Sequence, residues 1–77
     1  MRPSKYTHGS GKKKIVIAPF RDKWVIIMEN ENLGEYSTPQ MAVDDLVGGH
    51  TTFPPSGVDP STLELPEDLE DWKKSPL

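Results

Sequence analysis

The sequence contains no cysteine, so it can form neither a disulfide framework nor a thiolate zinc site. Its longest uninterrupted apolar stretch, Trp24 to Met28, has only five residues. A membrane-spanning helix needs about 20 apolar residues, and the basic N-terminal segment lacks the hydrophobic run of a signal peptide. We therefore expect a cytoplasmic protein that makes no contact with a membrane.

Histidine is also scarce, since His8 and His50 are the only two in the chain. Neither lies at a useful spacing from other potential metal ligands or from a nucleophile that needs a general base. Carboxylates occur as adjacent pairs, such as Asp44-Asp45, and adjacent side chains on a helix point in different directions. The sequence thus predicts no catalytic, metal or cofactor site, and a protein that is not an enzyme.

Basic residues are missing from most of the chain. No Lys or Arg occurs in residues 24–72, which hold eleven of the twelve acids, whereas residues 1–23 hold seven of the nine bases. Such segregation favours a binding role over an enzymatic one. It leaves two interpretations open: a solvated surface that keeps the protein soluble, or a charged face that meets a partner of opposite charge.

The 77 residues allow one domain, because a second core could not be closed with an apolar fraction of 34%. Residues 1–12 are dominated by Pro, Ser, Gly, His and Lys, a composition typical of disordered segments. We expect them to form a disordered basic tail. Residues 13–75 are then expected to form a single domain.

Three apolar runs predict strands. The β-branched run Ile15–Ile17, stopped by Pro19, is typical of a short edge strand. Trp24–Met28 is apolar on both faces, which indicates a central strand. A polar turn over residues 29–32 lets Leu33–Tyr36 return as its partner. The expected sheet is small and antiparallel, with about three strands.

The next segment predicts a well-capped helix. Ser37 fits the N-cap, Pro39 lies in the first turn, and Gln40 stands at the capping-box spacing. Gly48-Gly49 end the helix. Its apolar stripe consists of Ala42, Val43, Leu46 and Val47.

A short second helix is expected near the C-terminus. Pro66 would open it, with acids at its start and Lys73-Lys74 at its end, as the helix dipole favours. The predicted fold class is α+β, with the capped helix on the sheet and the C-terminal helix closing the core.

Asp44 and Asp45 lie in the last turns of the first helix, where the dipole makes negative charge unfavourable. They could pair with Lys12, Lys13 or Lys14 of the same chain, be merely solvated, or face a basic partner. We expect partner-binding contacts at Asp44, Asp45 and His50, with Tyr36 beside them.

Two other kinds of partner are open. The run Lys12, Lys13 and Lys14 could contact phosphates, but no exposed aromatic pair or known nucleic-acid motif accompanies it, so nucleic acid is less favoured than protein. The apolar strand at Ile15–Ile17 could instead pair with its copy as the edge of a homodimer.

The chain from residue 23 to residue 73 resembles a compact bacterial form of the GYF domain. The matching pieces are an aromatic-led strand, a glycine–aromatic step, a capped helix and a closing glycine, followed by a segment ending in tryptophan. They are Trp24-Val25-Ile26-Ile27, Gly34-Glu35-Tyr36-Ser37, Gln40-Met41, Gly48, and Ser61-Thr62-Leu63 through Asp71-Trp72. Glu35 stands where the family usually has proline, and Gly49-His50 replace its Tyr-Phe pair. The resemblance implies a sheet-plus-helix fold and an adaptor-like role.

The leading interpretation is a non-enzymatic, adaptor-like protein-interaction module in the bacterial cytoplasm. One alternative is a small inhibitor or antitoxin-like antagonist, whose acidic surface mimics nucleic acid or blocks a basic site. The other is a nucleic-acid binder that uses the basic tail.

Overall fold

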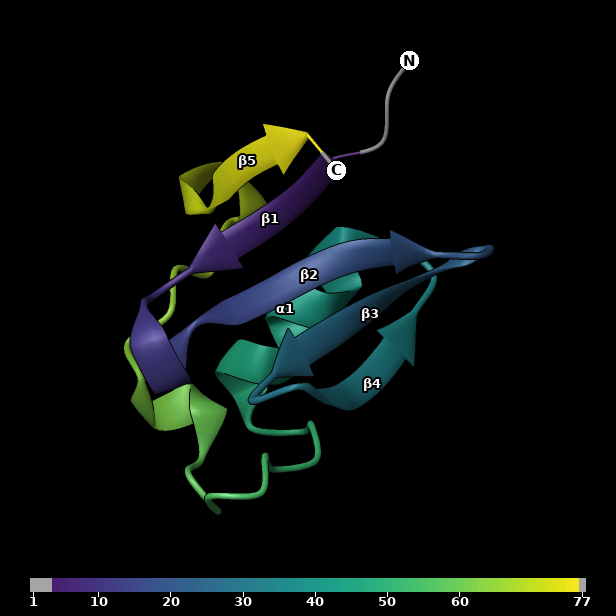
Figure 1. The fold of residues 1–77 in the computed structure, drawn as a ribbon. Helices are drawn as coiled ribbons and strands as arrows, with labels where there is room; N and C mark the ends of the chain where they lie inside the picture. Colours follow the sequence, from purple (N-terminus) through teal and green to yellow (C-terminus); the bar gives the residue numbers. More distant parts are fainter. Residues whose placement is uncertain (1–3, 77) are drawn as a thin grey trace.

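A five-stranded antiparallel sheet with one α-helix behind it forms the fold (Figure 1). The computed structural model describes residues 4–76, apart from the side chain of Lys12. The α+β class is confirmed, although the sheet has five strands where about three were expected. In spatial order the strands run β4-β3-β2-β1-β5. The elements are β1 (Ser4–His8), β2 (Ile15–Phe20), β3 (Lys23–Met28), β4 (Glu31–Tyr36), α1 (Pro39–Gly48) and β5 (Lys73–Pro76), with 3-10 turns η1 (Gly11–Lys13), η2 (Pro60–Thr62) and η3 (Leu69–Asp71).

The N-terminal segment differs most from expectation. Residues 4–8, predicted as part of a disordered tail, form β1, which pairs with β2 on one side and β5 on the other. Met1–Pro3, which were predicted as part of the same tail, lie outside the described residues. The prediction rested on composition and did not consider that side chains alternate along this segment. The alternation places Tyr6 and His8 opposite the core residues Ile17 and Ile15.

Strand β2 is therefore an interior strand, and the edge position predicted for Ile15–Ile17 is wrong. Pro19 does not stop the strand; it pairs with Trp24 of β3. It lies beyond the β2 residues that pair with β1, where its missing N–H costs no ladder hydrogen bond. The edges of the sheet are β4 and β5.

A tight turn joins β3 to β4. Glu29 and Asn30 have φ of 53° and 63°, the left-handed pair typical of a two-residue hairpin turn. The turn is thus shorter than the predicted four residues, and β4 already begins at Glu31. A register shift next to Ile26 and Ile27 accommodates Leu33, which is buried in the core.

Helix α1 matches its predicted span, but its caps differ in detail. Thr38, not Ser37, is the N-cap, and its hydroxyl accepts a hydrogen bond from the Met41 amide at 3.2 Å. At the other end Gly49 has φ of 76°, as expected for a C-terminal glycine. The amide of His50 donates to the Asp45 carbonyl at 2.9 Å, which completes the cap.

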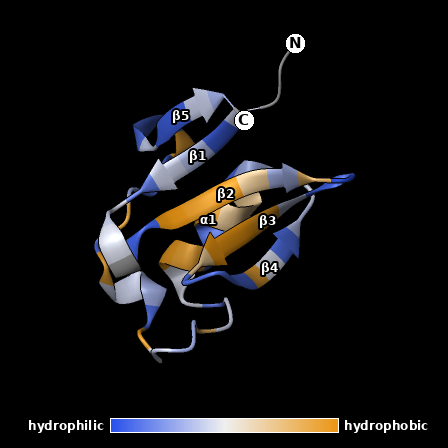
Figure 2. Cartoon of the chain, viewed as in Figure 1, coloured by the Kyte–Doolittle hydropathy of each residue, from blue (hydrophilic) through white to orange (hydrophobic). Residues whose placement is uncertain are grey.

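The core lies between α1 and one face of the sheet. Apolar residues are concentrated on β2, β3 and α1, whereas β1 and β5 are hydrophilic (Figure 2). Nine buried residues form the cluster: Ile15, Ile17, Ile26, Met28, Leu33, Ala42, Val43, Leu46 and Trp72. Tyr6, Trp24, Tyr36 and several leucines pack against it half-buried.

The predicted C-terminal helix is reduced to the single 3-10 turn η3. Asp68 caps this turn, and Trp72 then adopts an extended conformation that leads into β5. One helical turn would not hold alone, whereas Lys73–Pro76 gain hydrogen bonds to β1. Trp72 is only 3% exposed, and its indole N–H donates to the Pro66 carbonyl at 3.1 Å.

Candidate functional site

The predicted partner-binding residues lie around α1, but on different sides of it. Asp44 and Asp45 are separated by about 100° on the helix. Asp45 is directed to β4, where it meets Tyr36, and Asp44 lies on the flank that carries Gln40. The structure therefore brings Tyr36 and Asp45 together, and it separates them from Asp44.

Tyr36 lies beside the carboxylate of Asp45. Burial, and then the interaction with this carboxylate, raise the pKa of Tyr36 from 10.0 to about 12. The ring of Tyr36 also lies over Gly34, since a Cβ at that glycine would be 2.8 Å from the tyrosine hydroxyl oxygen. The pair thus fastens the last turns of α1 to β4, which explains an aspartate at the unfavourable end of the helix.

Asp44 also has a partner within the chain. Its Oδ1 accepts a hydrogen bond from Gln40 Nε2 at 3.0 Å. The same Nε2 donates to the Glu67 carbonyl at 3.1 Å, and Gln40 Oε1 accepts from the Leu69 amide at 3.2 Å. Gln40 therefore docks the segment before β5 onto α1, a role that replaces the predicted capping box.

His50 lies at the C-terminal end of α1. Its ring approaches Gly48, where a Cβ would come within 2.8 Å of the imidazole Cδ2. The side chain is exposed, and the structure gives it no contact with Asp44 or Asp45 beyond the backbone hydrogen bond of the cap. Of the four predicted residues, His50 stands apart.

The docking by Gln40 gathers acids from two distant parts of the chain. We call the group Asp44, Glu67, Asp68, Glu70 and Asp71 the acidic belt. All five are exposed. Among the described residues the ion pair found is Lys23–Glu35, at 3.8 Å, so neither Lys13 nor Lys14 neutralises Asp44 or Asp45.

An exposed apolar side chain lies next to the acidic belt. Met41 is 48% exposed on α1. It precedes Asp44 by three residues and Asp45 by four, so the two aspartates flank it on the helix surface. An apolar centre with a charged rim is the usual anatomy of a protein-binding surface.

The opposite side of the sheet carries a second surface, which α1 leaves uncovered (Figure 1). Because side chains alternate along a strand, the residues between the core positions of β2 and β3 point to this outer face. Four apolar side chains form its centre: Val16, Ala18, Val25 and Ile27. Lys5 and Thr7 of β1 lie on one side of them, and Asn32 and Glu35 of β4 lie on the other.

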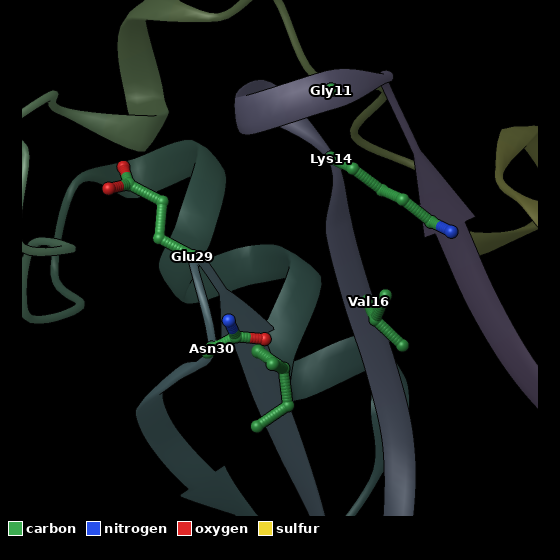
Figure 3. Close-up of a pocket in the computed structure, with 6 residues that line it drawn as sticks. Gly11, Lys14, Val16, Glu29 and Asn30 are labelled. Atoms are coloured by element: carbon green, nitrogen blue, oxygen red, sulfur yellow. The ribbon is translucent and has the colours of Figure 1, made fainter.

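A hollow of about 520 Å³ opens at one end of this outer face (Figure 3). Val16 and Ile27 form its apolar floor, and Lys14, Glu29 and Asn30 line its rim. The side chain of Lys14 extends towards β1 (Figure 3). The hollow is open and lacks a convergent set of polar groups, which fits a macromolecular contact better than a small-molecule site.

Sequence reasoning missed the outer face as a surface. The apolar alternation of Trp24–Met28 on both faces was visible and indicated a strand covered on both sides. Only the register across β1 to β4 shows that Lys5 and Glu35 lie at opposite borders of the same face.

Within residues 4–76, no three histidines or carboxylates are grouped so that they could hold a metal ion. The same part of the chain has no helix with the length and apolar character needed to cross a bilayer.

No protein-family model, curated protein or solved structure matches this chain. The resemblance to the GYF domain therefore stays a prediction.

Proposed function

We propose that this protein is a non-enzymatic, adaptor-like interaction module that binds a basic partner protein through the acidic belt and Met41. The observation that carries the proposal is the exposed Met41 among acids that no described lysine or arginine neutralises. This surface combines an apolar anchor with a majority of acidic charges. Lys74 lines a hollow with Glu70 but forms no ion pair with it.

Each component has a separate physical role. Met41 offers a flexible, polarisable side chain that adapts to a partner's surface, and removing its exposed area from water would favour binding. The acids accelerate the encounter with a positively charged partner and disfavour acidic competitors. Gln40 fixes the segment that carries four of the belt residues against α1.

The four partner-binding residues predicted from the sequence have different roles in this proposal. Asp44 belongs to the belt and touches the partner directly. Tyr36, Asp45 and His50 lie beyond Met41 and the helix end, and would border a larger contact. The adaptor-like role implied by the GYF resemblance is compatible with this arrangement, although the surface proposed here is helical and acidic.

Charge reversal tests the proposal. The wild-type protein, immobilised on beads, is expected to capture one or more basic proteins from a lysate of the source organism. The double variant D44K/E70K should lose them, and so should the wild type as added salt screens the exposed charges. The matched control D22K/E31K makes the same change in net charge at exposed positions outside the belt and should retain them. Equal capture by all three proteins would rule the acidic belt out.

The second candidate function is an inhibitor or antitoxin-like antagonist that uses the same acids as a nucleic-acid mimic. The exposed carboxylates of η3 and its neighbours, held at fixed positions on the surface, favour it. Competition separates the two: an antagonist's target should be released from the beads by added DNA or RNA, whereas an adaptor's partner should stay bound at the same salt concentration.

A further inference from the structure

The outer face of the sheet is apolar at its centre yet has no covering layer within the chain. Val25 is only 6% exposed, but Val16, Ala18 and Ile27 are half-buried and form a continuous block across β2 and β3. Strands that are apolar on both faces are usually covered on both faces. The block therefore suggests a second layer that a single copy does not supply.

Opposite charges border this block on its two sides. Lys5 lies on the β1 side, and Glu35, which is 3.8 Å from Lys23 of the same copy, lies on the β4 side. Extending the Thr7–Val16 register of β1 and β2 by two residues brings Lys5 opposite Ala18. Ala18 pairs with Val25, and Val25 pairs with Glu35, so Lys5 and Glu35 end the same cross-strand row. The next row runs from Thr7 through Val16 and Ile27 to Asn32.

Consider a second copy whose outer face lies against this one, related to it by a twofold axis. The axis lies between the two sheets, runs parallel to the strands and passes midway between β2 and β3, so each row of one copy lies over the same row of the other. Because β1 and β4 are equally far from the axis, β1 of one copy lies over β4 of the other. Lys5 then faces Glu35 of the second copy, and Val16 faces Ile27 of the second copy.

We propose that two copies of this chain associate face to face through the outer sheet surfaces, with a twofold axis between β2 and β3. The interface is isologous, so each charged contact occurs twice. The two sheets pack as an aligned sandwich, about 10 Å apart. Both α1 helices and both acidic belts then point outward, which gives a bivalent module.

Two other occupants fit the face less well. Single-stranded nucleic acid would find Lys5, Lys14 and Lys73 on one half and the Lys23–Glu35 ion pair on the other, but its charged backbone would not cover the apolar block. Pairing through an edge strand would also leave the apolar block uncovered. A second copy covers the block and places Lys5 opposite Glu35.

The first measurement is the mass in solution. Analytical ultracentrifugation over a concentration series should show an equilibrium between 8.6 kDa and twice that mass. The variant V16E, whose new side chain would lie in the middle of the interface, should be monomeric while its circular dichroism stays that of the wild type. A wild-type protein that remains at 8.6 kDa at its highest soluble concentration would overturn the proposal.

Charge exchange between copies is the decisive test. K5E and E35K alone each place like charges at two symmetric contacts, and each should weaken self-association about tenfold or more. An equimolar mixture should form a heterodimer in which both contacts again join opposite charges. Within one copy β1 and β4 are three strand spacings apart, about 14 Å, so restored association can arise only between chains.

Matched controls complete the design. K73E makes the same charge change on β5, which extends beyond β4 of the second copy when the axis lies between β2 and β3, and should leave association unchanged. Association that persists in V16E, or that the mixture fails to restore, would contradict face-to-face pairing. Binding of a single-stranded DNA oligonucleotide by a monomeric wild type, lost in K5E, would assign the face to nucleic acid and also overturn the proposal. None of these measurements depends on the partner of the acidic belt.

Discussion

Gln40 makes more connections than any other polar side chain described above. Its amide contacts Asp44, the Glu67 carbonyl and the Leu69 amide at 3.0 to 3.2 Å. Two of these bonds cross between parts of the chain that are 27 and 29 residues apart. A single side chain therefore determines how the segment before β5 lies on α1.

Replacing Gln40 by methionine keeps the side chain's length and removes its hydrogen bonds. The part-buried amide of Leu69 would lose its partner, and we expect Q40M to lower the free energy of unfolding by about 1–2 kcal/mol. Urea denaturation followed by circular dichroism measures the loss. In the control E67Q the backbone carbonyl of residue 67 still accepts the hydrogen bond from Gln40, since only the side chain is changed. Its free energy of unfolding should stay within about 0.5 kcal/mol of that of the wild type. Equal stability of Q40M and wild type would show that these bonds contribute nothing net.

Tyr36 predicts a stability change at high pH. Its pKa of about 12 in the fold exceeds the ordinary value of 10.0, so the folded state keeps the phenol proton to higher pH than the unfolded state. The stability this provides is complete below pH 10 and is lost as the pH rises through 12. The unfolding free energy of the wild type should therefore fall more steeply than that of Y36F over this range.

The cause of the raised pKa can be tested separately. In a Y6F background, which leaves Tyr36 as the only tyrosine, the phenolate absorbance reports its titration directly. The change D45N removes the negative charge but leaves the burial, so the pKa should drop below 12 while staying above 10.0. An unchanged pKa in D45N would mean that burial alone produces the shift.

At the scale of elements, β1 and β5 depend on each other. Strand β5 belongs to the sheet only through β1, with Ser4 opposite Pro76 and Thr7 opposite Lys73. Trp72, directly before β5, is part of the core, and its ring centroid lies 5.5 Å from that of His8, with the two rings tilted by 54°. A segment that looked like a tail thus holds the last core residue in place.

Deleting residues 1–8 should consequently damage the whole fold. Strand β2 would become an exposed edge, β5 would lose its only partner, and Trp72 would no longer be held against the core. We expect the truncated chain to lose its cooperative urea transition, with the combined fluorescence of Trp24 and Trp72 shifted towards that of exposed tryptophan. The control K5A, which keeps β1 intact, should unfold cooperatively at a similar urea concentration. An unchanged transition after the deletion would mean that β1 adds nothing to stability.

The elements differ in how well the sequence predicts them, and the reason is physical. Strands β2 and β3 and helix α1 carry strong local signals: β-branched runs, a capped first turn and a terminal glycine. Strands β1 and β5 are polar and short. β1 pairs with β2 nearby in the sequence, but β5 pairs only with β1, whose residues lie more than 60 positions earlier. No window of local sequence contains that information.

The same distinction applies to the candidate site. Asp44 and Asp45 stood out because they break a local rule at a helix end, and the structure gives each a partner, Gln40 and Tyr36 respectively. The acidic belt and the outer face could not be predicted, since both require contacts between distant segments. The belt depends on the docking by Gln40, and the matching rows depend on register across four strands.

At the scale of the whole molecule, the acids and bases that are separated along the sequence also lie on different sides of the fold. Belt acids lie on the side of α1 and η3, while Lys5, Lys14 and Lys73 lie towards β1 and β5 on the sheet side. The lysines of the outer face are accompanied there by Glu29 and Glu35, so this side is mixed in sign. The helix side, by contrast, is predominantly acidic, with Lys74 beside Glu70, and the proposed basic partner therefore belongs there.

The pairing of β1 with β5 also sets how the molecule responds to force. The chain enters β1 at Ser4 and leaves β5 at Pro76, and these two residues are directly opposite each other. A pull that separates the two ends loads the hydrogen bonds of this ladder one after another, as when a zipper opens, and never all together. The domain should thus resist heat or urea as a cooperative unit, yet yield readily to tension applied through its termini.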